Sequence, residues 1–142
     1  MSDIGRGAEQ RISSGRAEPE ISSLADSVQS HFRVEAQNHD RATVLAMSGE
    51  LDLASAPTLE EELEQIVSNP DTSTVILDLR QLEFMDSTGL SALIKAHQRA
   101  QEAGQRFGVV RGGAQVQRLL DLTGIGERIT LVDAPEELLD GG

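Results

Sequence analysis

A short run of acidic, hydroxyl and glycine residues, Asp86-Ser87-Thr88-Gly89, stands where a hydrophobic stretch gives way to a helical pattern. The first N–H groups of a helix have no partner inside it, so a helix start stabilises negative charge. The run therefore places a small hydroxyl, that of Ser87, where negative charge is tolerated, and Gly89 leaves this hydroxyl open to approach. The same spacing also fits a simple N-cap, in which Asp86 or Ser87 only binds those N–H groups.

The sequence lacks the motifs of common enzyme sites. It contains no G-x-S-x-G or G-x-x-x-x-G-K-[ST] run, and its glycines form no dinucleotide-binding fingerprint. A hydrolase dyad of Ser87 and Asp86 would lack a histidine close by in the sequence. Cysteine is absent, and His31, His39 and His97 are too scattered for metal-ligand spacing. We therefore predict a protein that is not an enzyme and that holds neither metal nor cofactor, with His97 packing in its helix.

The charge of the chain favours a protein or small-molecule partner. Its 142 residues carry a formal net charge of −12, which repels nucleic-acid phosphates and anionic lipid headgroups. No apolar run approaches the roughly 20 residues that a membrane-spanning helix needs. The first residues also lack the apolar segment of a secretory signal. We therefore expect a cytoplasmic protein that binds neither nucleic acid nor membrane.

One folded domain is expected after an N-terminal tail. Residues 1–29 are rich in glycine, serine, arginine and glutamate and show no sustained apolar period, which predicts a disordered tail. From residue 30 to residue 140 the apolar residues are regularly patterned. Alternation over 32–36, an apolar run over 43–47 and the turn residues Asn38-His39-Asp40 between them predict a hairpin.

Helical and strand patterns then alternate to the end of the domain. Pro57 is predicted at the first position of a helix that Ser55 could cap and that ends near Val67. A strand over 75–79 leads through a short loop to a helix from Ser87 to about Ala103, with Gly104 as its stop. Further strands are predicted over 107–110 and 129–132, and further helices over 116–120 and 135–139. The order β-β-α-β-α-β-α-β-α predicts an α/β fold with a mixed, mostly parallel sheet of about five strands and about four helices.

Three segments of this pattern resemble the STAS domains of anti-sigma factor antagonists. Residues 84–90 match the family motif F-x-D-S-[ST]-G-L, with threonine at the variable position. Residues 49–52 (Gly-Glu-Leu-Asp), together with Ala56-Pro57, match the family's approach to its first helix. Residues 116–124 match a later helix that ends in Thr-Gly. The resemblance covers residues 31–139 and implies the STAS fold.

The resemblance also implies a function. In this family the serine at the position of Ser87 is phosphorylated by an anti-sigma factor that carries a GHKL-type serine kinase domain. The unphosphorylated protein binds that partner and frees a sigma factor for transcription, and a serine phosphatase resets the cycle. Added phosphate would repel the partner from an acidic surface. The residues expected to bind the partner are Glu50, Asp52, Asp86, Ser87, Thr88 and Gly89.

Two alternatives remain open at this stage. Asp52 could serve only to cap a helix or as a solvated loop residue. STAS domains also act as scaffolds or subunits of stress-signalling assemblies, or in lipid-transport machinery, and such a role would need no phosphorylation switch.

Overall fold

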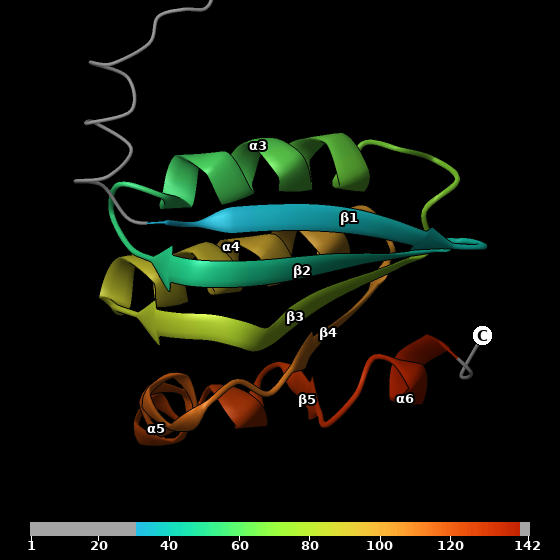
Figure 1. Cartoon of the computed structure of the whole chain (residues 1–142). Coiled ribbons are helices and arrows are strands. Elements are labelled where there is room, and N and C mark those ends of the chain that lie inside the picture. Colours follow the sequence, from blue (N-terminus) through green and yellow to red (C-terminus); the bar gives the residue numbers. More distant parts are fainter. Residues whose placement is uncertain (1–30, 140–142) are drawn as a thin grey trace, which may run out of the picture. The chain divides into compact units, whose positions relative to one another are not determined.

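A five-stranded sheet with helices packed against it makes up the described part of the chain, residues 31–139 of a computed structural model (Figure 1). The strands lie in the order β1-β2-β3-β4-β5, with β1 antiparallel to β2 and all other neighbours parallel. The α/β class and the mixed, mostly parallel sheet predicted from the sequence are confirmed. The tail predicted over residues 1–29 lies outside the described residues. The elements are β1 (Arg33–His39), β2 (Ala42–Leu51), α3 (Ala56–Val67), β3 (Thr74–Met85), α4 (Ser87–Glu102), β4 (Arg106–Val110), α5 (Ala114–Thr123), the 3₁₀ helix η2 (Ile125–Glu127), β5 (Thr130–Val132) and α6 (Glu136–Leu139).

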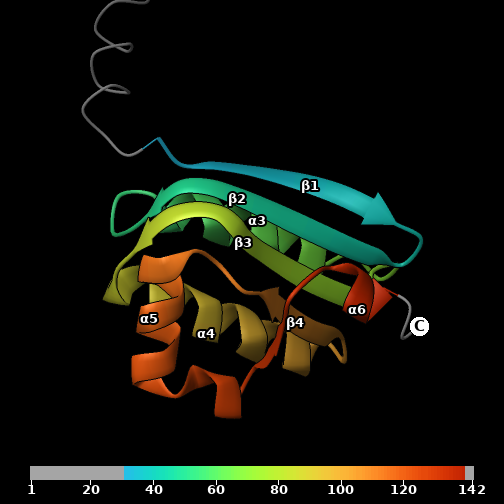
Figure 2. The ribbon, with the colours of Figure 1, turned by 60° about the horizontal axis from the view of Figure 1, so that its bottom comes forward.

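Alternate strand residues divide between two hydrophobic cores. Leu45 and Leu77 are fully buried and belong to the core that α3, α4 and α5 cover. Their neighbours Val44 and Ile76 belong to a second core, which includes Leu138 of α6. Because successive side chains of a strand point to opposite faces, the near-continuous apolar runs are buried on both sides. Figure 2 shows α3 and α4 beside each other against one face of the sheet.

The central strand is longer than the sequence predicted. β3 continues past Leu79 to Met85, so only Asp86 separates it from α4, and the predicted short loop is wrong. β4 pairs with β3 only as far as Asp78 and ends at Val110. The second half of β3 therefore pairs with β2 alone. Its exposed polar side chains interrupt the apolar run, so the sequence pattern did not predict this part of the strand.

The start of α3 also differs from the prediction. The helix begins at Ala56, so Pro57 occupies the second helical position, where a missing N–H is equally tolerated. Ser55 holds the N-cap position, but its side chain does not cap the helix. Its hydroxyl donates to the carbonyl oxygen of Glu50 at 2.7 Å and accepts from the N–H of Asp52 at 2.9 Å. Ser55 therefore closes the loop between β2 and α3.

The hairpin turn is shorter than predicted, while two other expectations are confirmed. Asn38 and His39 remain in β1, and Asp40 turns the chain with a left-handed backbone (φ 57°) that aspartate tolerates. Gly104 (φ 73°) follows the end of α4 as predicted. His97 is half-buried, and its ring centroid lies 5.5 Å from that of Phe107, as expected of a packing residue.

Candidate functional site

Ser87 lies at the edge of the sheet where β2 and β3 end side by side. Leu51 pairs with Met85, and the N–H of Asp86 donates to the carbonyl oxygen of Leu51 at 3.3 Å. Because the two strands are parallel, the segments that follow them emerge at the same edge (Figure 1). The residues predicted to bind a partner are thus brought together on this edge, here called the serine rim: Glu50, Asp52, Asp86, Ser87, Thr88 and Gly89.

The N-cap of α4 is Asp86, not Ser87. Asp86 Oδ1 accepts from the N–H groups of Thr88 at 2.9 Å and Gly89 at 3.0 Å. Ser87 is the first residue of the helix and is exposed, whereas Thr88 is half-buried. Within residues 31–139 the Ser87 hydroxyl makes no hydrogen bond. The cap and the exposed hydroxyl are therefore separate features carried by neighbouring residues.

Gly89 has a packing role that the sequence did not reveal. Gly89 is buried, and a Cβ atom at this position would lie 2.6 Å from the carbonyl oxygen of Leu51 and 2.6 Å from Met85 Cγ. Only a residue without a side chain lets the first turn of α4 approach the ends of β2 and β3 this closely. The structure thus adds close contact between helix and strands, and the role of Gly89 in leaving the hydroxyl open stays a prediction.

Three acidic residues lie on the segments that end at the same edge as the exposed hydroxyl. Glu50 is exposed, and Asp52 and Asp86 are half-buried. Asp52 Oδ1 accepts from the N–H groups of Ala54 at 3.1 Å and Ser55 at 3.2 Å, so this side chain orders its own loop, which the sequence did not predict. Within the described residues Oδ2 of Asp52 and Oδ2 of Asp86 make no hydrogen bond. The serine rim thus carries one exposed neutral hydroxyl and three acidic residues.

Gln115 of α5 binds the end of β3 next to the serine rim, a contact that the sequence did not predict. Its Oε1 accepts from the N–H of Met85 at 3.0 Å, and its Nε2 donates to the Met85 carbonyl oxygen at 3.0 Å. β4 has already ended, so this side-chain amide makes the bonds that a neighbouring strand would make. Leu51 of β2 and Gln115 therefore hold the end of β3 from its two sides.

A polar pair in β3 has a structural explanation. Asp78 is buried within the strand predicted from its apolar residues, and Arg80 binds it through Nε at 3.0 Å and Nη2 at 2.8 Å. The hydrogen bond and the charge of Asp78 raise the pKa of the Arg80 guanidinium above its ordinary value. Each charge is satisfied by the other, as buried carboxylates require.

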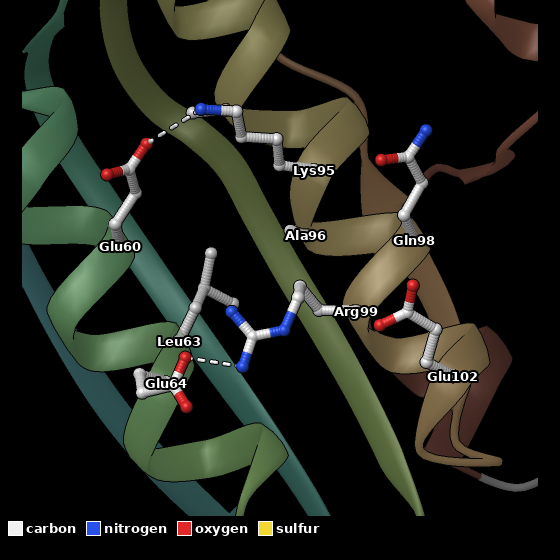
Figure 3. A pocket seen from close by; sticks show the side chains of 9 residues that line it. Glu60, Leu63, Glu64, Lys95, Ala96, Gln98, Arg99 and Glu102 are labelled. Atoms are coloured by element: carbon white, nitrogen blue, oxygen red, sulfur yellow. Dashed lines mark ion pairs between the residues drawn. The ribbon is translucent and has the colours of Figure 1, made fainter.

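The groove between α3 and α4 is an alternative location for a site (Figure 3). It has a volume of about 350 Å³, and Leu63 lies among its lining residues. Two ion pairs span it, Glu60 with Lys95 at 3.9 Å and Glu64 with Arg99. All four of these side chains are about half exposed or more, and such pairs contribute little to stability. The groove lies along the middle and the end of α4, apart from Ser87.

Residues 31–139 offer neither a cluster of metal ligands nor a helix that could span a membrane. In this part of the chain no group of three or more histidine, aspartate and glutamate side chains could hold a metal ion. None of its helices is both long enough and apolar enough to cross a bilayer.

Removing the cap is expected to separate the structural role of Asp86 from its role on the surface. Asp86→Ala should lower the free energy of unfolding by about 1 kcal/mol, because two N–H groups lose their acceptor. Asp86→Asn keeps a capping oxygen and should restore most of that stability while removing the charge. Urea unfolding of the three proteins checks this, and equal losses in both variants would contradict the capping role.

Removing the Gln115 amide is expected to loosen the end of β3. Gln115→Ala should cost about 1 kcal/mol and increase hydrogen exchange at the amide of Met85, because both hydrogen bonds to the backbone of Met85 are lost. Gln117→Ala is the matched control, since Gln117 lies on the same helix and binds Asp121 instead of the rim. Unchanged hydrogen exchange at the Met85 amide in Gln115→Ala would show that the hydrogen bonds from Gln115 do not hold the end of β3.

Comparison with known proteins agrees with the resemblance drawn from the three sequence motifs. Residues 33–138 match the family model of the STAS domain. The anti-sigma-F factor antagonist RsfB of Mycobacterium tuberculosis is 34% identical over 106 residues, which cover 73% of this chain and 84% of RsfB. A crystal structure of an anti-sigma factor antagonist from Mycobacterium paratuberculosis is similar with a TM-score of 0.71 and 28% identity, covering 78% of this chain and 92% of that one.

A more distant structure shares the fold. The anti-sigma factor antagonist SpoIIAA in its unphosphorylated form superposes with a TM-score of 0.64 at 20% identity, covering 77% of this chain and 93% of SpoIIAA. The family model, the sequence relative and the shared fold all point to the same domain family. The chain therefore belongs to the STAS domain family, among relatives that are anti-sigma factor antagonists.

Proposed function

We propose that this protein is an anti-sigma factor antagonist of the cytoplasm. Unphosphorylated, it binds an anti-sigma factor through the serine rim and so frees a sigma factor for transcription. The anti-sigma factor carries a GHKL-type serine kinase domain and phosphorylates Ser87, which ends the binding. A serine phosphatase removes the phosphate and restores the active form.

The observation that carries this proposal is the position of Ser87. Its side chain is exposed at the first residue of α4, next to a cap that Asp86 supplies. A kinase can therefore reach the hydroxyl without unfolding the helix. The relatives named as anti-sigma factor antagonists support the same role.

In the proposed phosphoryl transfer, the partner kinase supplies the catalytic groups and this protein supplies the hydroxyl of Ser87. Oγ of Ser87 attacks the γ-phosphorus of ATP, the bond between that phosphorus and the oxygen of ADP breaks, and a base of the kinase takes the hydroxyl proton. The phosphoserine then carries a charge of about −1.5 to −2 at pH 7. On this rim the charge would lie beside Asp86, whose Oδ1 already takes the N–H groups of Thr88 and Gly89. The helix start tolerates this charge, so the fold is kept and the phosphate faces the partner as added negative charge.

Mapping the phosphate tests the proposal. Wild type, Ser87→Ala and Thr88→Val are incubated with ATP and lysate of the native organism, followed by intact-mass analysis and identification of the proteins retained. We expect one phosphate on wild type and Thr88→Val and none on Ser87→Ala, with an ATPase-like partner retained by unphosphorylated protein. If Ser87 is never modified and partners bind regardless of ATP, a scaffold without a phosphorylation switch is the correct function.

A further inference from the structure

Two large apolar side chains are exposed on the segments that form the serine rim. In residues 31–139 three large apolar residues are exposed: Leu53 at 76%, Leu122 at 74% and Phe84 at 38%. Leu53 lies in the loop between β2 and α3, directly after Asp52. Phe84 lies near the end of β3 and pairs in register with Glu50. A single exposed leucine is ordinary, but two such residues at one edge, each beside a rim carboxylate, suggest a contact surface.

The loop that carries Leu53 is held in place by its own side chains. Asp52 Oδ1 accepts from Ala54 and Ser55, and the Ser55 hydroxyl donates to the Glu50 carbonyl oxygen at 2.7 Å. The N–H of Ala56 also donates to the Asp52 carbonyl oxygen at 2.8 Å. A leucine on a loop ordered in this way loses little further backbone freedom when a partner buries it. The fold thus presents this apolar side chain to solvent from an ordered position.

The charges around these two side chains indicate the chemistry of their partner. Glu50, Asp52 and Asp86 flank them on the rim, and Glu83 next to Phe84 is also exposed. Interfaces commonly bury an apolar centre within a charged margin, and opposite charges across the margin guide association. A complementary surface would have an apolar pocket bordered by lysine or arginine side chains.

We propose that Leu53, supported by Phe84, is the apolar specificity-determining contact with the anti-sigma factor, received by an apolar pocket with a basic border. This inference rests on the proposed function, because it takes the anti-sigma factor as the partner. The phosphorylation switch does not by itself require an apolar contact, and this inference adds that requirement. Partner choice depends on an apolar residue outside the Asp-Ser-Thr-Gly run.

A pair of leucine substitutions tests the inference. Leu53→Ser is compared with Leu122→Ser, because the two leucines are almost equally exposed and Leu122 lies at the far end of α5. Each is titrated calorimetrically, as the full unphosphorylated chain, with the anti-sigma factor retained in the phosphate-mapping experiment. Leu53→Ser should bind at least about tenfold more weakly, equivalent to about 1.4 kcal/mol, and Leu122→Ser within about twofold of wild type.

The outcomes separate this inference from the proposed function. If wild type binds and Leu53→Ser binds equally well, or Leu122→Ser is weakened as much, the specificity role of Leu53 is wrong and the proposed function stands. If wild type binds no anti-sigma factor, both fail. Melting temperatures of the variants equal to that of wild type exclude a loss through unfolding, and raised ionic strength should slow association if the pocket border is basic.

Discussion

Phosphorylation of Ser87 is expected to weaken binding to the anti-sigma factor on the order of 100-fold while leaving the melting temperature nearly unchanged. The affinity falls because a charge of about −2 is added among Glu50, Asp52 and Asp86, and because binding must remove water from it. The fold persists because Ser87 is exposed and Asp86, rather than Ser87, caps α4. Calorimetric titration and thermal unfolding of the phosphorylated and unphosphorylated chains measure the two effects.

A charge placed elsewhere on α4 is the control for this prediction. Gln98 is exposed about three turns after Ser87, beside the α3–α4 groove. Ser87→Glu should reproduce part of the loss of affinity, and Gln98→Glu should bind within about twofold of wild type if position matters more than net charge. Equal weakening by the two variants would mean that overall charge, not the rim, governs association.

Filling the space at Gly89 is expected to cause the largest loss of stability among these substitutions. The Cβ of Gly89→Ser would lie 2.6 Å from both the Leu51 carbonyl oxygen and Met85 Cγ, so a strand end or the helix must move. Overpacking of this kind costs about 1–3 kcal/mol, more than the few tenths that serine gains over glycine in helix propensity. We expect a loss of about 2 kcal/mol in urea unfolding, with weaker partner binding because the rim shifts.

Gly113→Ser is the matched control for Gly89→Ser. Gly113 is the N-cap of α5, a Cβ there meets nothing within 4 Å, and serine is a favourable residue at this position. This variant should be as stable as wild type or slightly more stable. A Gly89→Ser protein as stable as Gly113→Ser would show that the contact between α4 and the strand ends is not tight.

The order of elements could be predicted because each element carries its own periodic pattern. The apolar run over 75–79 and the stripe of α4 identify their elements without knowledge of any neighbour. The family resemblance named Asp52 and Asp86 together, and the parallel strands β2 and β3 place the segments after them at one edge. Whether Ser87 is exposed then depends on which of the two adjacent residues, Asp86 or Ser87, caps α4.

The remaining features depend on contacts between distant parts of the chain. Gln115 binds Met85 across 30 residues, and nothing in the pattern of α5 indicates that its amide reaches β3. The tight fit of Gly89 becomes visible only when Leu51 is placed beside it. The length of β3 was missed because its second half pairs on one side only and carries polar residues. These features fix the position of the serine rim through contacts between distant residues, and local sequence patterns do not predict such contacts.

Release of a sigma factor tests the central claim most directly. The anti-sigma factor is first bound to its fluorescently labelled sigma factor, and free sigma factor is followed by anisotropy as this protein is added. Unphosphorylated protein should release the sigma factor, protein phosphorylated on Ser87 should not, and treatment with a serine phosphatase should restore release. If the unphosphorylated protein binds the complex and releases no sigma factor, or if the phosphorylated form releases it equally well, the account of this protein as a phosphorylation-controlled anti-sigma factor antagonist is contradicted.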